Sequence, residues 1–125
     1  LYDDYAHHPT EIRATLQGAR DLFPDKKITV VFQPHTYSRT HELFDDFVEE
    51  LSKADRVILA PIYAAREVNE SGVSSEQLAE KIPNAVAKGT LEEIAEEVKN
   101  GVSEHDVVLV MGAGTIAQLS PMLVG

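Results

Sequence analysis

The most unusual chemistry of this sequence lies near its beginning, in the segment Asp3-Asp4-Tyr5-Ala6-His7-His8. Carboxylates, a phenol and imidazoles stand there directly ahead of a predicted helix, a combination that folding rarely needs. A histidine can accept the proton of an amine near neutral pH, and an aspartate can orient that histidine or bind a ribose or ammonium group. The adjacent helix start favours a phosphate. In a purely structural interpretation, the carboxylates only complement the helix dipole and the histidines are hydrogen-bonded surface groups.

A second polar segment, His35-Thr36-Tyr37-Ser38-Arg39-Thr40, follows the clearest predicted strand and leads into a helix. Arg39 could hold a small carboxylate through paired, charge-assisted hydrogen bonds, with His35 nearby. In the structural interpretation, Arg39 is a surface residue and Thr36 or Ser38 serves only as a helix cap. This segment therefore predicts a carboxylate site, and the position of Arg39 in the fold decides between the two interpretations.

A glycine-rich turn, Gly112-Ala113-Gly114, follows a predicted buried strand and precedes a short expected helix. Ala117 stands where a dinucleotide-binding turn has its last glycine, so the motif is incomplete. Tight packing of strand against helix explains these glycines as well as phosphate binding does. The segments 63–67 and 69–72 are predicted to form a solvated connection, or else a rim or lid beside the same face.

The elements that must position these residues follow from hydrophobic periodicity. Short apolar runs alternate with amphipathic stretches, which is typical of βαβ units on a mostly parallel sheet. Strands are predicted at residues 28–32, 57–60 and 107–111, with weaker candidates at 1–5 and 84–87. The prediction is an α/β, Rossmann-like fold with a mostly parallel sheet and helices on both faces, in a single domain spanning residues 1–125.

Capping residues set the expected helix boundaries. Pro9 suits the first turn of the first helix, and Pro24 ends that helix. A second helix is expected over residues 43–51, and capping boxes at Ser74 and Thr90 start two more.

Ligands of open α/β sheets bind beyond the carboxyl ends of the strands, where the polar segments of this sequence also fall.

Composition excludes several classes of protein. A chain of 125 residues that is 43% hydrophobic is the size of one compact domain, and its lack of cysteine excludes disulfides and thiolate zinc sites. The net charge of −10 argues against nucleic acid and anionic membranes as partners. No apolar run approaches the roughly 20 residues of a spanning helix, and the start resembles no signal peptide, so a cytoplasmic protein is expected. The opening Leu1-Tyr2-Asp3 suggests an excised domain or a processed terminus.

Two stretches carry a resemblance to a known family. Residues 3–11, Asp-Asp-Tyr-Ala-His-His-Pro-Thr-Glu, and residues 32–40, Phe-Gln-Pro-His-Thr-Tyr-Ser-Arg-Thr, closely resemble signature sequences of UDP-N-acetylmuramate:L-alanine ligases, in the Mur ligase family. The resemblance continues at Asp45-Asp46-Phe47, Ala54-Asp55-Arg56-Val57, Ile62-Tyr63-Ala64-Ala65 and Met111-Gly112-Ala113-Gly114-Thr115-Ile116. It therefore covers essentially the whole chain.

The resemblance implies the third, C-terminal domain of such a ligase, with the N-terminal UDP-sugar domain and the central ATP-binding domain as its partners. In that family ATP phosphorylates the muramoyl carboxylate, and the amine of L-alanine attacks the acyl phosphate to form an amide of the peptidoglycan precursor. Mg²⁺ serves the phosphates. The phosphate-binding loop G-x-x-x-x-G-K-[ST] occurs nowhere in this sequence, so the isolated domain is expected to be inactive.

Roles for individual residues follow from the same resemblance. Asp4 and His7 are expected to reach the nucleotide and the reacting centre, with Asp3 and His8 as weaker candidates. The expected L-alanine site consists of Tyr5, His35 and Arg39. No metal ligand is assigned, and which histidine accepts the proton of the amine stays open.

Two positions depart from the family pattern: Ala6 replaces a common glycine, and Thr36 stands where many members have a second arginine. The second departure puts more of the carboxylate binding on Arg39. A sibling ligase that attaches whole peptides to the same sugar shares the first stretch but generally lacks the second. Two functions of different classes also fit the residues: a non-catalytic nucleotide-binding module, and a metal-dependent hydrolase that uses Asp3, Asp4, His7 and His8.

Overall fold

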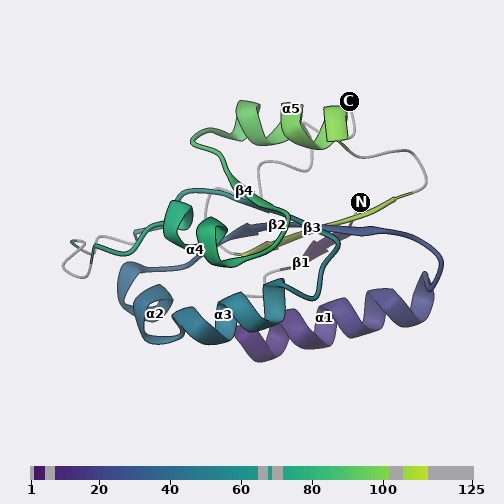
Figure 1. The fold of residues 1–125 in the computed structure, drawn as a ribbon, viewed down its shortest axis with the longest axis horizontal. Helices are drawn as coiled ribbons and strands as arrows, with labels where there is room; N and C mark the ends of the chain where they lie inside the picture. Colours follow the sequence, from purple (N-terminus) through teal and green to yellow (C-terminus); the bar gives the residue numbers. More distant parts are fainter. Residues whose placement is uncertain (1, 5–7, 65–67, 69–71, 102–105, 113–125) are drawn as a thin grey trace.

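The computed structural model describes residues 2–4, 8–64, 68, 72–101 and 106–112, with the backbone alone at 2–4 (Figure 1). The strands are β1 (Tyr2–Asp4), β2 (Ile28–Gln33), β3 (Arg56–Leu59), β4 (Ala85–Ala87) and β5 (Val107–Gly112). The helices are α1 (Pro9–Leu22), α2 (Tyr37–Glu42), α3 (Phe44–Leu51), α4 (Ser75–Lys81) and α5 (Leu91–Gly101). None of these helices has the length and apolarity to span a membrane. The helix expected after Gly114 lies outside the described residues.

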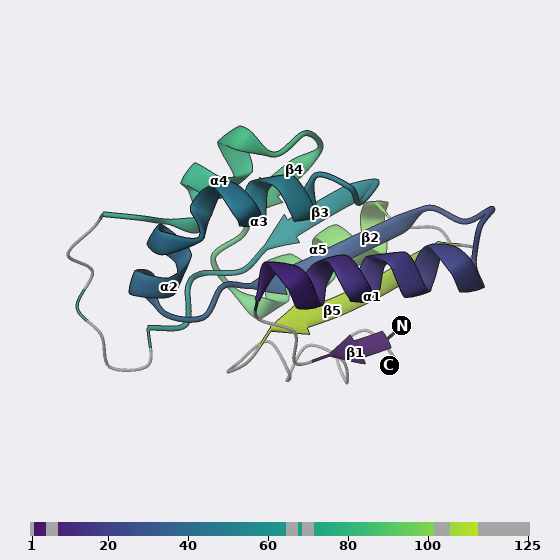
Figure 2. The same cartoon turned by 90° about the horizontal axis from the view of Figure 1, so that it is seen from below.

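The strands form one five-stranded parallel sheet in the order β1-β5-β2-β3-β4, which Figure 2 shows from the α1 side. The chain crosses the sheet in one direction from β1 to β4, and α5 then leads it back to β5. Parallel crossovers are right-handed, so this reversal puts α5 on the opposite face from α1 and α3. Figure 1 shows α5 alone on one side of the sheet. The predicted α/β fold with helices on both faces is confirmed.

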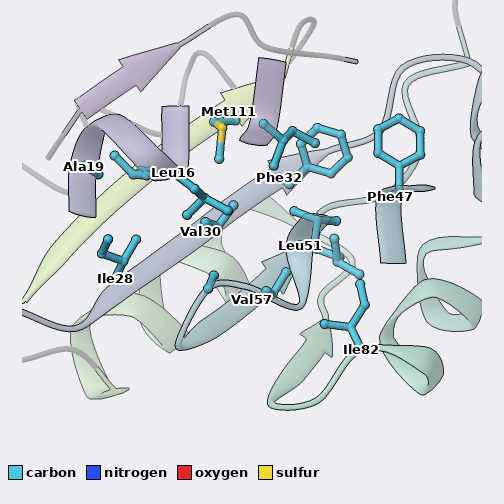
Figure 3. Packing of buried hydrophobic residues seen from close by; sticks show 14 of the residues in the cluster. Leu16, Ala19, Ile28, Val30, Phe32, Phe47, Leu51, Val57, Ile82 and Met111 are labelled. Carbon is cyan, nitrogen blue, oxygen red and sulfur yellow. The ribbon is translucent and has the colours of Figure 1, made fainter. Parts of the chain in front are cut away.

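The core consists of two layers, one on each face of the sheet. In β2, Val30 and Phe32 belong to the layer beneath α1 and α3, whereas Val31 belongs to the layer beneath α5. Every residue of β2 and β5 is buried, as expected for parallel strands covered on both sides. Figure 3 shows Phe32 beside Phe47 of α3, where the ring centroids are 5.4 Å apart.

Most predicted element boundaries are confirmed. Pro9 begins α1, and that helix ends at Phe23, its C-cap, directly before Pro24. The Ser74 side chain accepts a hydrogen bond from the Gln77 N–H, and that of Thr90 accepts one from the Glu93 N–H. Both capping boxes therefore start helices where the sequence predicted them.

The helix expected over residues 43–51 is only part of what forms there. α2 occupies residues 37–42, and α3 starts at Phe44 after Leu43, whose φ of −104° and ψ of 18° interrupt the helical geometry. The apolar periodicity identified α3 because its Phe47 and Leu51 are buried in the core. It does not mark α2, because Thr40 is the one buried residue of that helix, but the cap expected at Thr36 or Ser38 does, and Thr36 is the N-cap.

Asp55 ties together the amino ends of β2 and β3, at the edge of the sheet away from the polar segments. Its carboxylate accepts hydrogen bonds from the Ile28 N–H at 2.7 Å and from Arg20 Nη1 at 3.0 Å. Its backbone N–H donates to the Ile28 carbonyl at 3.0 Å. Burial opposes ionisation of Asp55, but the Ile28 hydrogen bond and the Arg20 guanidinium outweigh it and hold the pKa below its ordinary value of 3.8.

We expect Asp55→Asn to destabilise the domain at pH 7 by about 1 kcal/mol, a value that allows for solvent screening of this partly exposed carboxylate. Because the folded-state pKa is depressed, the stabilisation is fully present above the unfolded-state pKa and disappears as pH falls through the folded-state value. Urea unfolding at pH 7 and pH 3 should show the difference between wild type and variant shrinking in acid. The exposed Asp25→Asn is the control, and a difference that persists undiminished in acid would contradict this role.

Candidate functional site

The strands that lead into the two polar segments end at the same, carboxyl edge of the sheet. β1 and β2 both pair with β5, and Met111 of β5 is level with Asp4 on one side and with Phe32 on the other. The ends of β1 and β2 are therefore two strand spacings apart, about 10 Å. The ends of β1 and β2, from which the two polar segments continue along the chain, therefore flank the end of β5. The structure thus confirms that β1 and β2 end at the same edge of the sheet, and the meeting of the two polar segments there stays a prediction.

The chain after β2 keeps an extended path beyond the end of the strand. His35 forms a parallel bridge with Tyr63, which follows β3. The Tyr63 N–H donates to the Pro34 carbonyl at 2.9 Å, and the Thr36 N–H donates to the Tyr63 carbonyl at 2.8 Å. These bonds extend the pairing of β2 with β3 to the candidate site.

Thr36 turns the chain from this extended path into α2. Its φ of 62° is a disfavoured conformation for a β-branched residue, so neighbouring contacts must hold it. Its hydroxyl oxygen accepts a hydrogen bond from the Arg39 N–H at 3.3 Å, and its carbonyl accepts one from the buried Thr40 hydroxyl at 2.7 Å. Thr36 is thus the N-cap of α2, and Ser38 lies inside the helix.

Arg39 lies in the first turn of α2, only four residues after His35, and its side chain is exposed. Within the part of the chain that the structure describes, its guanidinium has no ion pair or hydrogen bond. Arginine binds carboxylates through two parallel N–H donors, so a guanidinium at this strand end is available to a small acidic ligand.

His8 has a structural contact of its own. Its Nδ1 accepts a hydrogen bond from the Thr10 N–H at 3.2 Å and lies 2.5 Å from the Thr10 hydroxyl, so this histidine is the N-cap of α1. The interpretation of a hydrogen-bonded surface histidine therefore holds for His8. Tyr5 and His7 lie outside the described residues, and of Asp3 and Asp4 only the backbone is described, in β1.

Tyr63 is a residue at this edge whose role the sequence did not predict, because its segment was expected to be a solvated connection or rim. Its ring stacks on His35, with centroids 5.7 Å apart and an angle of 26° between the ring planes. The signal was present, since Tyr63 follows β3 and His35 follows the adjacent β2. Which strands are adjacent, however, is a tertiary property.

A cavity of about 230 Å³ lies next to Tyr63. Residues from the ends of β2, β3 and β4 and from the start of α5 line it, including Gln33, Pro61, Tyr63, Thr90 and Ile94. Gln33 is buried, and its side-chain amide donates to the Pro61 carbonyl at 3.1 Å. This hydrogen bond joins the ends of β2 and β3 at the wall of the cavity.

Gly112 has a packing reason to be glycine. Its φ is +122°, and a Cβ built on it would lie 2.6 Å from the backbone oxygen of Gln33, its partner in β2. A side chain is therefore excluded by backbone geometry alone. Ala113 and Gly114 lie outside the described residues, so phosphate binding by them remains a prediction.

Metal binding depends on the ligand types that the fold brings together. In the described residues, no group of three or more His, Cys, Asp or Glu side chains could hold an ion. A metal-dependent hydrolase would use Asp3, Asp4, His7 and His8 as ligands. Of these four side chains, the structure describes only that of His8.

The chain is similar to UDP-N-acetylmuramate–L-alanine ligases. It is 51% identical over 118 residues to the UDP-N-acetylmuramate–L-alanine ligase of Aquifex aeolicus, and 52% identical over 117 residues to that of Lactobacillus helveticus. These matches cover 94% and 93% of this chain but 26% of each relative, so the chain spans about a quarter of their length.

Solved structures agree with these sequence similarities. The UDP-N-acetylmuramate–alanine ligase of Thermotoga maritima superposes with a TM-score of 0.75 at 31% identity, over 96% of this chain and 24% of that chain. A separate domain, assigned to a UDP-N-acetylmuramate:L-alanyl-gamma-D-glutamyl-meso-diaminopimelate ligase of Haemophilus ducreyi, superposes with a TM-score of 0.68 at 25% identity, over 98% of this chain and 85% of that one. The model of the Mur ligase glutamate ligase domain matches residues 1–114, and this chain belongs to that family.

Proposed function

We propose that this chain is the C-terminal, third domain of an ATP-dependent UDP-N-acetylmuramate:L-alanine ligase of the cytoplasm. The observation that carries the proposal is the exposed Arg39 in α2, the helix that follows the stacked His35 at the carboxyl edge, in a chain 51% identical over 118 residues to such a ligase. A guanidinium suits the carboxylate of an amino acid, and an imidazole suits its amine. In this proposal, Arg39 and His35, together with Tyr5, bind L-alanine.

The proposed reaction needs two kinds of contact at this edge. ATP transfers a phosphoryl group to the muramoyl carboxylate, the L-alanine amine attacks the resulting acyl phosphate, and loss of phosphate and of the amine proton leaves the amide. Asp4 and His7 are proposed to face the nucleotide and the reacting carbonyl. His8 is a weaker candidate than His7 because its Nδ1 already caps α1. Asp3 stays a weaker candidate beside Asp4.

ATP and Mg²⁺ would be held mainly outside this chain. The sequence has no phosphate-binding P-loop, and the described residues bring no metal-ligand group together. The proposed partners are therefore the N-terminal and central domains of the same polypeptide, with this domain closing over them. Closure would align the reactants in a site that excludes water. The chain alone should be inactive.

The sibling ligase that attaches peptides is the second candidate, and one structural relative bears the name of such a ligase. The sequence identity favours the alanine ligase, because the relatives that are 51% and 52% identical bear that name, against 25% for the sibling domain. A free-standing nucleotide-binding module predicts tight, saturable ATP binding by this chain alone. A metal-dependent hydrolase predicts stoichiometric micromolar binding of manganese or zinc to it.

Phosphate release by the complete polypeptide tests the proposal. With ATP, Mg²⁺ and UDP-N-acetylmuramate present, phosphate release should depend on L-alanine, and replacing L-alanine with the tripeptide that the sibling ligase uses should abolish it. The 125-residue chain alone should release none under the same conditions. Release that requires the peptide instead of L-alanine would favour the sibling, and release that requires neither would contradict both.

A further inference from the structure

Tyr63 is held against His35 by its own backbone. The Tyr63 N–H and carbonyl both bond to the segment 34–36, one on each side of His35. The two Cα atoms are therefore fixed relative to each other, whatever side chain stands at position 63, provided that it is not proline. The Tyr63 side chain is thus free to serve a purpose other than joining the two loops.

The Tyr63 ring does not belong to the core. It is 37% exposed, it lies in neither buried cluster, and its hydroxyl has no hydrogen-bond partner in the described part of the chain. Its ring faces the His35 imidazole at 5.7 Å with an angle of 26° between planes, which is an offset-stacked arrangement. The ring, and not the hydroxyl, is the part of Tyr63 that acts on His35.

An imidazole needs such a restraint if it is to present one nitrogen to a ligand. The torsion that rotates the ring of histidine is broad and roughly two-fold, so the backbone leaves the ring plane undetermined. Thr36, held at φ 62° by its own hydrogen bonds, limits backbone movement directly after His35. The stacked ring of Tyr63 then limits rotation of the imidazole itself.

We infer that Tyr63 is a positioning residue for the amino-acid site: its ring sets the plane of the His35 imidazole and so the direction in which His35 meets the amine of the substrate. The inference rests on the proposed function, in which His35 contacts L-alanine. Tyr63 acts on the substrate only through His35. Its loss should therefore impair the use of L-alanine and leave the use of ATP and the UDP-sugar unchanged.

Nuclear magnetic resonance of the 125-residue chain tests the stacking by itself. In wild type and Tyr63→Phe, the His35 imidazole protons should show an upfield ring-current shift. In Tyr63→Leu, which keeps the backbone bonds and an apolar side chain, that shift should disappear. His41, exposed on α2, is the internal control whose signals should not move. An unchanged His35 spectrum in Tyr63→Leu would overturn the inference.

Kinetics of the complete polypeptide test the consequence. Tyr63→Leu should lower kcat/KM for L-alanine by about three- to tenfold, the range that corresponds to loss of one aromatic contact, while KM for ATP stays unchanged. Tyr63→Phe should restore wild-type values. Equal losses for all substrates, or no rescue by phenylalanine, would overturn the positioning role, because either result means that the ring does not act specifically on His35.

The two hypotheses fail in different ways. Alanine-dependent turnover that Tyr63→Leu leaves unchanged would overturn the positioning role and leave the proposed function intact. A wild-type polypeptide without alanine-dependent turnover would overturn the proposed function and the inference that rests on it.

Discussion

Arg39→Ala is expected to raise KM for L-alanine by about 10- to 100-fold in the complete ligase, with a much smaller effect on kcat. Hydrogen bonds to a charged group contribute about 1.5–3 kcal/mol, which corresponds to this range. The exposed Arg39 guanidinium has no ion pair within the described residues, so its removal should cost binding and not folding. By the family resemblance, Thr36 stands where a second arginine is common, and Arg39 is therefore expected to carry most of the carboxylate binding. Initial rates of phosphate release against L-alanine concentration would measure the change.

Arg13→Ala is the matched control, because it removes the same charge from an exposed position on α1. It should leave KM for L-alanine unchanged. Arg39→Lys should fall between wild type and alanine, since it keeps the charge but loses the paired donors. The contrast with His7→Ala is equally informative: that variant should mainly lower kcat if His7 faces the reacting centre. A wild-type KM for L-alanine in Arg39→Ala would mean that Arg39 does not bind the carboxylate of L-alanine.

Gly112→Ala is expected to destabilise the domain by about 2–5 kcal/mol, combining a strained backbone conformation with a steric clash. At φ +122° the added Cβ would lie 2.6 Å from the Gln33 backbone oxygen. That oxygen belongs to the central strand β2, so it cannot move away without disturbing the pairing of β2 with β5. Urea unfolding of the chain, followed by circular dichroism, would measure the lowered midpoint.

Gly18→Ala provides the control of opposite sign. Gly18 lies inside α1, and a Cβ added there would meet nothing within 4 Å. Alanine is a better helix former than glycine, so this variant should stabilise the domain by about 0.5–1 kcal/mol. A Gly112→Ala variant as stable as wild type would contradict the close packing of Gly112 against the Gln33 backbone. The glycine would then need another explanation, such as contact with a ligand.

Local patterns were sufficient to predict most of the secondary structure. The apolar run at residues 28–32 became β2, Pro9 began α1, and the Thr90 capping box began α5. Each of these signals acts over one strand or one helical turn, so each can be read from adjacent residues. α2, a helix of six residues with one buried side chain, has no periodicity to detect, and only the cap expected at Thr36 or Ser38 indicated where it begins.

The candidate site was predicted only in its parts. The residue types at positions 35 and 39, and their place after a strand, predicted a carboxylate site without any structure. The tertiary fold alone decided that β5 separates the end of β1 from β2, that Tyr63 stacks on His35, and that Gly112 lies against the Gln33 backbone. The physical reason is that strand order depends on packing between residues far apart in the chain. Local sequence determines which residues stand at a strand end, and the fold determines which strand ends are neighbours.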